Sequence, residues 1–155
     1  MNSMAHFDES TVWTVVDISD RFGALPVSRI CLDPLPGSAT EKDVIALEAS
    51  KNRLFELVDG VLVEKAMGFY EAYIASLLVT YLTNYTRDND LGIVAGADGM
   101  VRLAPGLVRI PDAAFVSWQR LPDRVIPRDP IPNLVPDLAV EIISKSNTAE
   151  EMAPN

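Results

Sequence analysis

The stretch RLFELVDGVLVEK, residues 53–65, decides how the middle of this chain folds. Two short apolar runs flank Asp59–Gly60, a dipeptide that favours the two-residue turn with positive φ at both central positions. The stretch therefore predicts an antiparallel β-hairpin. Glu56 interrupts the first apolar run although the turn does not need it, whereas Glu64 and Lys65 are interpreted as solvated charges that close the hairpin.

A long helix and several strands are predicted after the hairpin. Residues 69–85 carry apolar side chains at i, i+3 and i+4 spacing, which is typical of a helix with one buried face. We interpret this face as core rather than as a ligand site; it consists of Tyr70, Ile74, Leu77, Leu78, Tyr81 and Leu82. Short strands are predicted after the helix, at residues 91–95, 100–103, 108–117 and 138–144.

Two shorter helices are predicted before the hairpin. Residues 11–22 have amphipathic spacing, and Gly23 is suited to end a helix there. Thr40 and Asp43 indicate the start of a second helix that runs to about residue 49. Helices, a hairpin, a helix and then strands together predict an α+β fold with a mainly antiparallel or mixed sheet.

Composition narrows the possible chemistry. The chain has 155 residues, the size of one domain, and its net charge of −9 argues against a protein that coats nucleic acid non-specifically, although a local basic groove stays possible. One cysteine, Cys31, excludes an intramolecular disulfide, and one histidine, His6, disfavours a Ser-His-Asp triad. Carboxylate chemistry is the main remaining option. Without a signal peptide or membrane segment in the sequence, a cytoplasmic location is expected.

Two acids on successive predicted strands are candidate metal ligands. Asp112 follows a proline in LVRIPDAAFV, and Glu141 lies inside the apolar run LAVEII. An ionised carboxylate in apolar surroundings is costly unless it is paired, hydrogen-bonded or bound to a metal. If the two strands are neighbours, the converging carboxylates suit Mg²⁺ or Mn²⁺, and such a metal can activate water for attack on a phosphodiester.

Structural interpretations of the same acids remain open. Glu141 could lie on the wet face of an edge strand, or could pair with Arg102 or Arg109, and the Pro-Asp pair at Asp112 could be an ordinary turn. Glu71 begins the long helix, where an acid also complements the helix dipole.

Three strings resemble a known family: FELVDGVLVEKAMG at 55–68, VRIPDAAFVSWQRLP at 108–122 and VPDLAVEIISKSNTAEEM at 135–152. They are similar to the bacterial putative restriction endonuclease family of the PD-(D/E)XK nuclease superfamily, over roughly residues 25–153. The resemblance implies a restriction-endonuclease-like domain at 25–155, apparently truncated at its C-terminus, preceded by a helical extension at 1–24. It also implies a DNA endonuclease that depends on Mg²⁺ or Mn²⁺ and acts as a homodimer.

The resemblance assigns roles to four acids. Asp112 matches the Asp of the PD motif and Glu141 the acid of the (D/E)XK element, so both would hold the metal. Glu56 sits at the ELVDG-like motif of the family. Glu71 falls where the first core helix presents a polar residue toward the site.

One motif residue is missing. The superfamily pattern places a lysine two residues after the acid, where this chain has Ile143, and similar proteins carry it on a helix beyond the point where this sequence ends. Lys145 would reach the site only through a bend. Weak or absent activity is therefore expected. The alternatives are a non-catalytic, nuclease-derived binding or assembly module, and a nuclease that acts on something other than duplex DNA.

Overall fold

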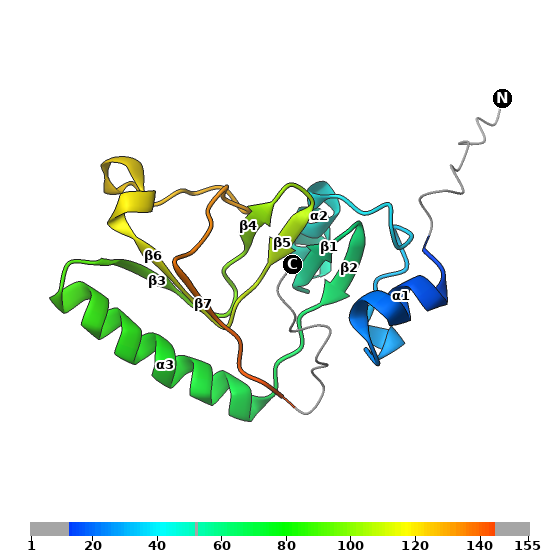
Figure 1. Ribbon diagram of the computed structural model, residues 1–155, viewed down its shortest axis with the longest axis horizontal. Helices are drawn as coiled ribbons and strands as arrows, with labels where there is room; N and C mark the ends of the chain where they lie inside the picture. The colour runs from blue at the N-terminus through cyan, green and yellow to red at the C-terminus, as the bar shows by residue number, and fades with distance from the viewer. Residues whose placement is uncertain (1–12, 52, 145–155) are drawn as a thin grey trace.

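The computed structural model describes residues 13–51 and 53–144 (Figure 1). Its helices are α1 (Val15–Phe22), α2 (Glu41–Lys51) and α3 (Phe69–Asp88), with short 3₁₀ turns η2 (Val27–Arg29), η3 (Trp118–Arg120) and η4 (Pro122–Arg124). Its strands are β1 (Phe55–Val58), β2 (Val61–Glu64), β3 (Gly92–Ala95), β4 (Val101–Ala104), β5 (Leu107–Arg109), β6 (Ala113–Ser117) and β7 (Leu138–Val140). The α+β class predicted from the sequence is confirmed.

The strands form two antiparallel sheets rather than one. One sheet has the order β2-β1-β5-β4 and the other β3-β6-β7. The predicted strand 108–117 is divided between them, because β5 ends at Arg109 and β6 begins at Ala113. Pro111 lies in the gap, and a proline has no N–H to donate to a strand ladder. The chain therefore changes sheets at residues 110–112.

The predicted hairpin is confirmed. Val58 pairs with Val61, and Asp59 and Gly60 both have positive φ, at 51° and 75°. A side chain at Gly60 would also collide with the backbone of Gly37, so two independent features require glycine there.

The hairpin is buried on both faces, which explains why its apolar runs are nearly continuous. Side chains of Phe55, Leu57 and Leu62 pack in one cluster with residues of α2 such as Val44 and Leu47. The alternate side chains pack in a second cluster with Phe22 at the end of α1; these are Val58, Val61 and Val63. Strand alternation thus assigns one face to α2 and the other to α1.

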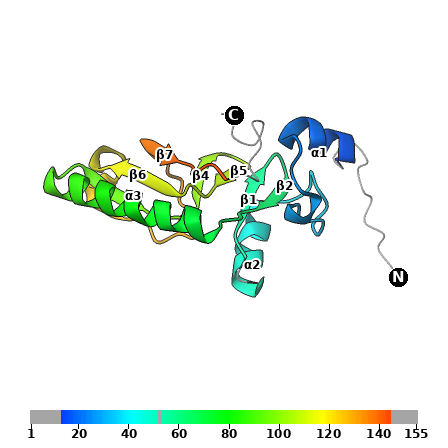
Figure 2. The same cartoon turned by 90° about the horizontal axis from the view of Figure 1, so that it is seen from below.

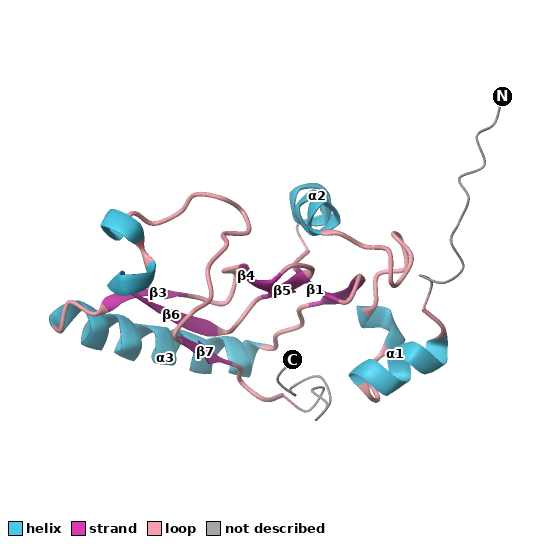
Figure 3. Cartoon of the chain, turned by 45° about the horizontal axis from the view of Figure 1, so that its top comes forward, coloured by secondary structure: helices cyan, strands magenta, loops and turns pink. Residues whose placement is uncertain are grey.

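The helices surround the two sheets unevenly. α3 packs along β3 and β6, while α2 packs against β1. Figure 2 shows α3 running the length of the β3-β6-β7 sheet, with α1 and α2 at the opposite end near β1 and β2. Figure 3 shows the two sheets side by side, so that the passage from β5 to β6 lies in the middle of the molecule.

The shorter helices begin and end near the predicted residues. Thr14 and Asp17 form a capping box at α1, and Gly23 ends it with a φ of 67°. Thr40 donates backbone and side-chain hydrogen bonds to the Asp43 carboxylate at the start of α2. Residues 11 and 12 of the first predicted helix lie outside the described residues.

The long helix is confirmed, but half of its predicted buried face is exposed. Tyr70 and Tyr81 are 69% and 70% exposed, and Leu77 is also exposed. α3 is apolar around much of its circumference, so the spacing predicted the helix without identifying which face packs. Its outer face carries a large apolar residue every four positions: Phe69, Tyr73, Leu77, Tyr81 and Tyr85. Each helix within the described residues is too short or too polar to span a bilayer.

Candidate functional site

Asp112 lies at the point where the chain passes from one sheet to the other. It is 2% exposed, and its backbone N–H donates to the carbonyl of Val140 at 2.9 Å. The backbone N–H of Ile142 donates in turn to Oδ2 of Asp112 at 2.6 Å. One hydrogen bond therefore holds the Asp112 backbone, and the other holds its carboxylate, against the end of β7.

Glu141 faces Asp112 because of the register of β7. Ala113 pairs with Val140, so the next residues along the antiparallel pair, Asp112 and Glu141, lie opposite one another. The predicted strand 138–144 is shorter than expected and ends at Val140, so Glu141 follows the strand instead of lying within it. Its side chain is about one third exposed.

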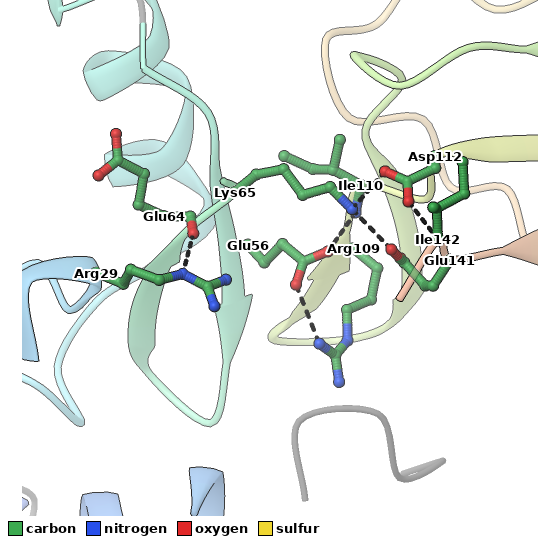
Figure 4. Close-up of polar contacts among 9 residues, drawn as sticks. All are labelled: Arg29, Glu56, Glu64, Lys65, Arg109, Ile110, Asp112, Glu141 and Ile142. Carbon is green, nitrogen blue, oxygen red and sulfur yellow. Dashed lines mark hydrogen bonds and ion pairs between the residues drawn. The ribbon is translucent and has the colours of Figure 1, made fainter. Parts of the chain in front are cut away.

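Lys65 joins these two carboxylates. Its Nζ lies 3.0 Å from Oδ1 of Asp112 and 2.7 Å from Oε2 of Glu141. Figure 4 shows the lysine extending from the hairpin to the two acids. Because both oxygens contact one nitrogen, they are no farther apart than the two contact lengths together. The structure thus brings Asp112 and Glu141 to a single point.

The interpretation of Lys65 as a solvated charge is wrong. The Lys65 side chain is only 12% exposed, and its backbone N–H donates to the carbonyl of Leu54, which extends the hairpin ladder by one pair. Strand alternation places its side chain on the same face as Val63 and Glu56, toward the β5–β6 passage. Glu64 points the other way and pairs with Arg53.

Glu56 lies beside the site and supports it. It is 6% exposed; Oε1 accepts a hydrogen bond from the backbone N–H of Ile110 at 2.8 Å, and Oε2 pairs with Arg109 at 3.1 Å. Both carboxylate oxygens are therefore engaged. Glu56 holds the segment that leads into Asp112 and offers no free oxygen to a metal.

Negative charge is in excess at this point. The ion-pair partners of Glu56, Asp112 and Glu141 among the described residues are Lys65 and Arg109. Burial raises the pKa of Glu141, and the nearby Glu56 and Asp112 add to that rise, while Lys65 opposes it. Burial lowers the pKa of Lys65, but its acidic neighbours outweigh burial, so the net pKa lies above the ordinary value.

The donor chemistry fits a hard divalent cation held by two carboxylates. Oδ1 of Asp112 is buried and accepts no hydrogen bond within the described residues, although Nζ of Lys65 lies near it. Mg²⁺ is typically bound by one or two carboxylates and keeps several waters. The described residues contain no group of three or more His, Cys, Asp or Glu side chains that could hold a metal ion. The described residues therefore fit a divalent cation that is held by two carboxylates and completes its coordination with water.

The remaining predicted residues do not join this point. Glu71 lies in the first turn of α3 with its carboxylate against Gly68, the N-cap residue, and no hydrogen bond or ion pair within the described residues links it to Asp112 or Glu141. Its role in catalysis stays a prediction. Lys145 and His6 lie outside the described residues.

The arginines considered as partners of Glu141 are engaged elsewhere. Arg102 pairs with Glu41, and Arg109 pairs with Glu56. Glu141 does form an ion pair, but with Lys65. The alternative proposed from the sequence was thus right about an ion pair and wrong about the cation.

Sequence reasoning missed Lys65, yet a signal was present. Val61, Val63 and Lys65 alternate along one strand and share a face, and Glu56 lies opposite Val63 on that face. A lysine that continues a buried face beside a buried acid is a candidate for an internal ion pair. The two residues it reaches could not be identified from the hairpin alone.

Comparison with known proteins identifies the family. A family model described as Uma2, putative restriction endonuclease, matches residues 42–153. A comparison with curated proteins finds no match. The matched segment contains the hairpin, Asp112 and Glu141, and it covers well over half of the sequence. The chain therefore belongs to the Uma2 family of putative restriction endonucleases.

Proposed function

We propose that this chain is a divalent-metal-dependent DNA endonuclease of the PD-(D/E)XK type, with Asp112 and Glu141 as the ligands of Mg²⁺ or Mn²⁺. The observation that carries the proposal is the meeting of these two carboxylates and Lys65 at one point. Membership of a family of putative restriction endonucleases supports DNA as the substrate. Hard oxygen donors in an acidic, mostly buried setting support the choice of metal.

Each residue of the site has a separate role in the proposed reaction. When bound, the metal neutralises charge on the phosphate and lowers the pKa of the attacking water. Asp112 and Glu141 bind it, and the hydrogen bond from the backbone N–H of Ile142 orients the Asp112 carboxylate. Glu56 positions the segment before Asp112 through Ile110 and Arg109. Lys65 donates hydrogen bonds to the attacking water or to a phosphate oxygen.

Lys65 removes the reason for expecting an inactive protein. That expectation rested on the missing lysine after Glu141, where Ile143 stands. The structure has an ammonium 2.7 Å from the Glu141 carboxylate, supplied by the hairpin instead of by the motif. A lysine only needs to reach the acids in space, so its place in the sequence can differ. We therefore propose that the described part of the site is sufficient for cleavage.

We also propose that the chain acts as a homodimer through the outer face of α3. This face is formed by Phe69, Tyr73, Leu77, Tyr81 and Tyr85, all exposed and uncharged. Aromatic enrichment and a lack of charge are features of interface cores. A second copy supplies the same uncharged aromatic surface, as a two-fold interface requires. A cytoplasmic location remains a prediction from the sequence.

A non-catalytic binding module is the second candidate function. The observation that favours it is the ion pairing itself, because Lys65 already neutralises part of the charge that a metal would neutralise. The net charge of −9 also disfavours encounter with DNA. In this case the acids and the lysine would be a structural ion-pair cluster.

Plasmid relaxation at low salt with Mg²⁺ or Mn²⁺ separates the two functions. The wild-type chain is expected to nick plasmid, and Asp112→Asn and Glu141→Gln are each expected to abolish nicking. Glu48→Gln is the matched control, because Glu48 is an exposed acid on α2 and its removal changes the net charge equally. Absence of nicking by every protein would favour the binding module, whereas nicking that survives both site substitutions would come from a contaminant or from a different site.

A further inference from the structure

The Lys65 ammonium occupies the position that a cation shared by Asp112 and Glu141 would take. Its Nζ is 3.0 Å from Oδ1 of Asp112 and 2.7 Å from Oε2 of Glu141, so both oxygens are turned toward the ammonium (Figure 4). A divalent ion bound to the same oxygens needs contacts of about 2.0–2.6 Å. Lysine and metal therefore cannot both occupy the point between these two oxygens.

Lys65 differs from the other cation of the site in this respect. Arg109 pairs with Glu56, whose second oxygen is held by the backbone of Ile110, so this pair can persist when a metal binds. The Lys65 ammonium would instead face the like charge of the metal at short range. Repulsion between two such cations in a partly buried setting is strong.

The structure leaves Lys65 a route away from the acids. The lysine follows the last residue of β2, and its neighbour Ala66 is exposed. Glu141, its partner, is about one third exposed, so the site opens toward solvent on that side. The four-carbon stem of a lysine can move its ammonium to water while the stem stays packed. Displacement therefore requires no change in either sheet.

We propose that Lys65 is an internal competitor for the metal: it binds Asp112 and Glu141 in the metal-free protein and must move before a divalent cation can bind them. This inference rests on the proposed function for the identity of the metal ligands. Beyond that function, it states that Lys65 lowers the affinity of the site for metal, because the metal must replace an ion pair that is already formed. A purely structural lysine would stabilise the fold without lowering metal affinity.

Calorimetry with Mn²⁺ and no DNA tests the proposal. Lys65→Gln and Lys65→Met are expected to bind Mn²⁺ about ten-fold tighter than wild type or more, because an obstructing cation is gone. Lys42→Gln is the matched control, since it removes an exposed lysine of α2 and changes the net charge by the same amount. It should bind as wild type does. Asp112→Asn should abolish binding in the wild-type and Lys65→Gln backgrounds.

Thermal melting gives a second readout that does not depend on activity. In chelator, Lys65→Gln should melt below wild type, because two acids lose their cation. Mn²⁺ should raise its Tm by more than it raises the wild-type Tm, since tighter ligand binding gives greater stabilisation. Lys65→Met keeps most of the aliphatic part of the lysine side chain, so it replaces Lys65→Gln in this measurement if Lys65→Gln does not fold. Failure of Mn²⁺ to restore folding in both would overturn the proposal.

The outcomes distinguish this inference from the proposed function. Equal Mn²⁺ affinity in wild type and both Lys65 variants, with loss in Asp112→Asn, overturns the competitor role and leaves the metal site standing. Weaker binding in the Lys65 variants likewise overturns it. Absence of Mn²⁺ binding in every protein overturns both.

Discussion

Nζ of Lys65 and Oδ1 of Asp112 lie 3.0 Å apart, although one follows the hairpin and the other joins the two sheets. This contact links the four-stranded sheet to the point where the chain leaves it. Because Glu141 shares the same ammonium, three separate segments meet there. The lysine at this meeting point lies outside the motif pattern, which places a lysine two residues after Glu141.

Lys65 should be required for cleavage while it opposes metal binding. Replacing it with Gln is expected to lower the single-turnover rate of plasmid nicking by about 10²–10⁴-fold, the usual contribution of a positioned proton-transfer or water-orienting group. Saturating Mn²⁺ should not restore the rate, because the metal site is intact and the ammonium is missing. Wild-type cleavage by Lys65→Gln at saturating metal would show that the lysine has no part in the chemistry.

Glu56 should contribute to the stability of the fold and to the position of the segment before Asp112, and it should not act as a metal ligand. Glu56→Ala leaves Arg109 and the N–H of Ile110 without their acceptor, so the free energy of unfolding should fall by about 1–3 kcal/mol. Glu56→Gln keeps one acceptor oxygen and should lose less. Urea denaturation measures both values.

Mn²⁺ calorimetry on the same variants checks the positioning role of Glu56. Glu56→Gln should retain measurable binding, because neither Glu56 oxygen is a proposed ligand. Complete loss in this variant, with an unchanged fold by circular dichroism, would instead make Glu56 a ligand.

Local patterns in the sequence predicted the hairpin and the helices well. Asp59–Gly60 specifies its turn through backbone preferences alone, and Gly23 ends its helix in the same way. The division of residues 108–117 between two sheets was missed although Pro111 marks it. A proline at a strand start is also ordinary, so it does not by itself separate one strand from two.

The site was only partly predictable for a different reason. An acid in an apolar strand signals an unusual environment, which identified Glu141, and Asp112 was identified as the acid at the head of a predicted strand that could neighbour it. The partner that satisfies them depends on tertiary contacts, which periodicity does not encode, and so Lys65 was missed. The outer face of α3 shows the same limit, because Tyr81 is apolar enough for a core and yet lies 70% exposed.

Asp137 should link the stability of the β6–β7 pair to acid pH. Its carboxylate accepts hydrogen bonds from the backbone N–H of Ser117 at 2.8 Å and from Arg120 at 2.7 Å. The backbone hydrogen bond, followed by the Arg120 contact, lowers the pKa of Asp137 from 3.8 to about 2. The folded state thus favours the ionised form. Its stabilising effect is fully present above pH 3.8 and is lost as the pH falls toward 2.

Asp137→Asn tests this dependence directly. Wild type should be more stable than the variant near pH 5, and the difference should shrink between pH 3.8 and about 2. Urea midpoints measured across that range give the comparison. A difference that stays constant with pH would mean that the ionised form contributes nothing and that only the hydrogen-bond geometry matters.

The outer face of α3 should hold two copies of the chain together. Phe69, Tyr73, Tyr81 and Tyr85 are each more than half exposed and together offer on the order of 500 Å² of aromatic surface. A standard interface buries roughly 800 Å² per partner, so this face with its neighbours is of the right size. Tyr81→Glu places a charge at its middle, where desolvation would be costly.

Light scattering coupled to gel filtration measures the result of that substitution. Wild type should elute with the mass of a dimer and Tyr81→Glu with that of a monomer, while circular dichroism stays the same because Tyr81 makes little contact within the chain. Ala46→Glu adds the same charge to an exposed position of α2 and should leave the dimer intact. A wild-type chain that is monomeric at every concentration would rule out this interface. A dimer that survives both Tyr81→Glu and Tyr73→Glu would place the interface on another surface.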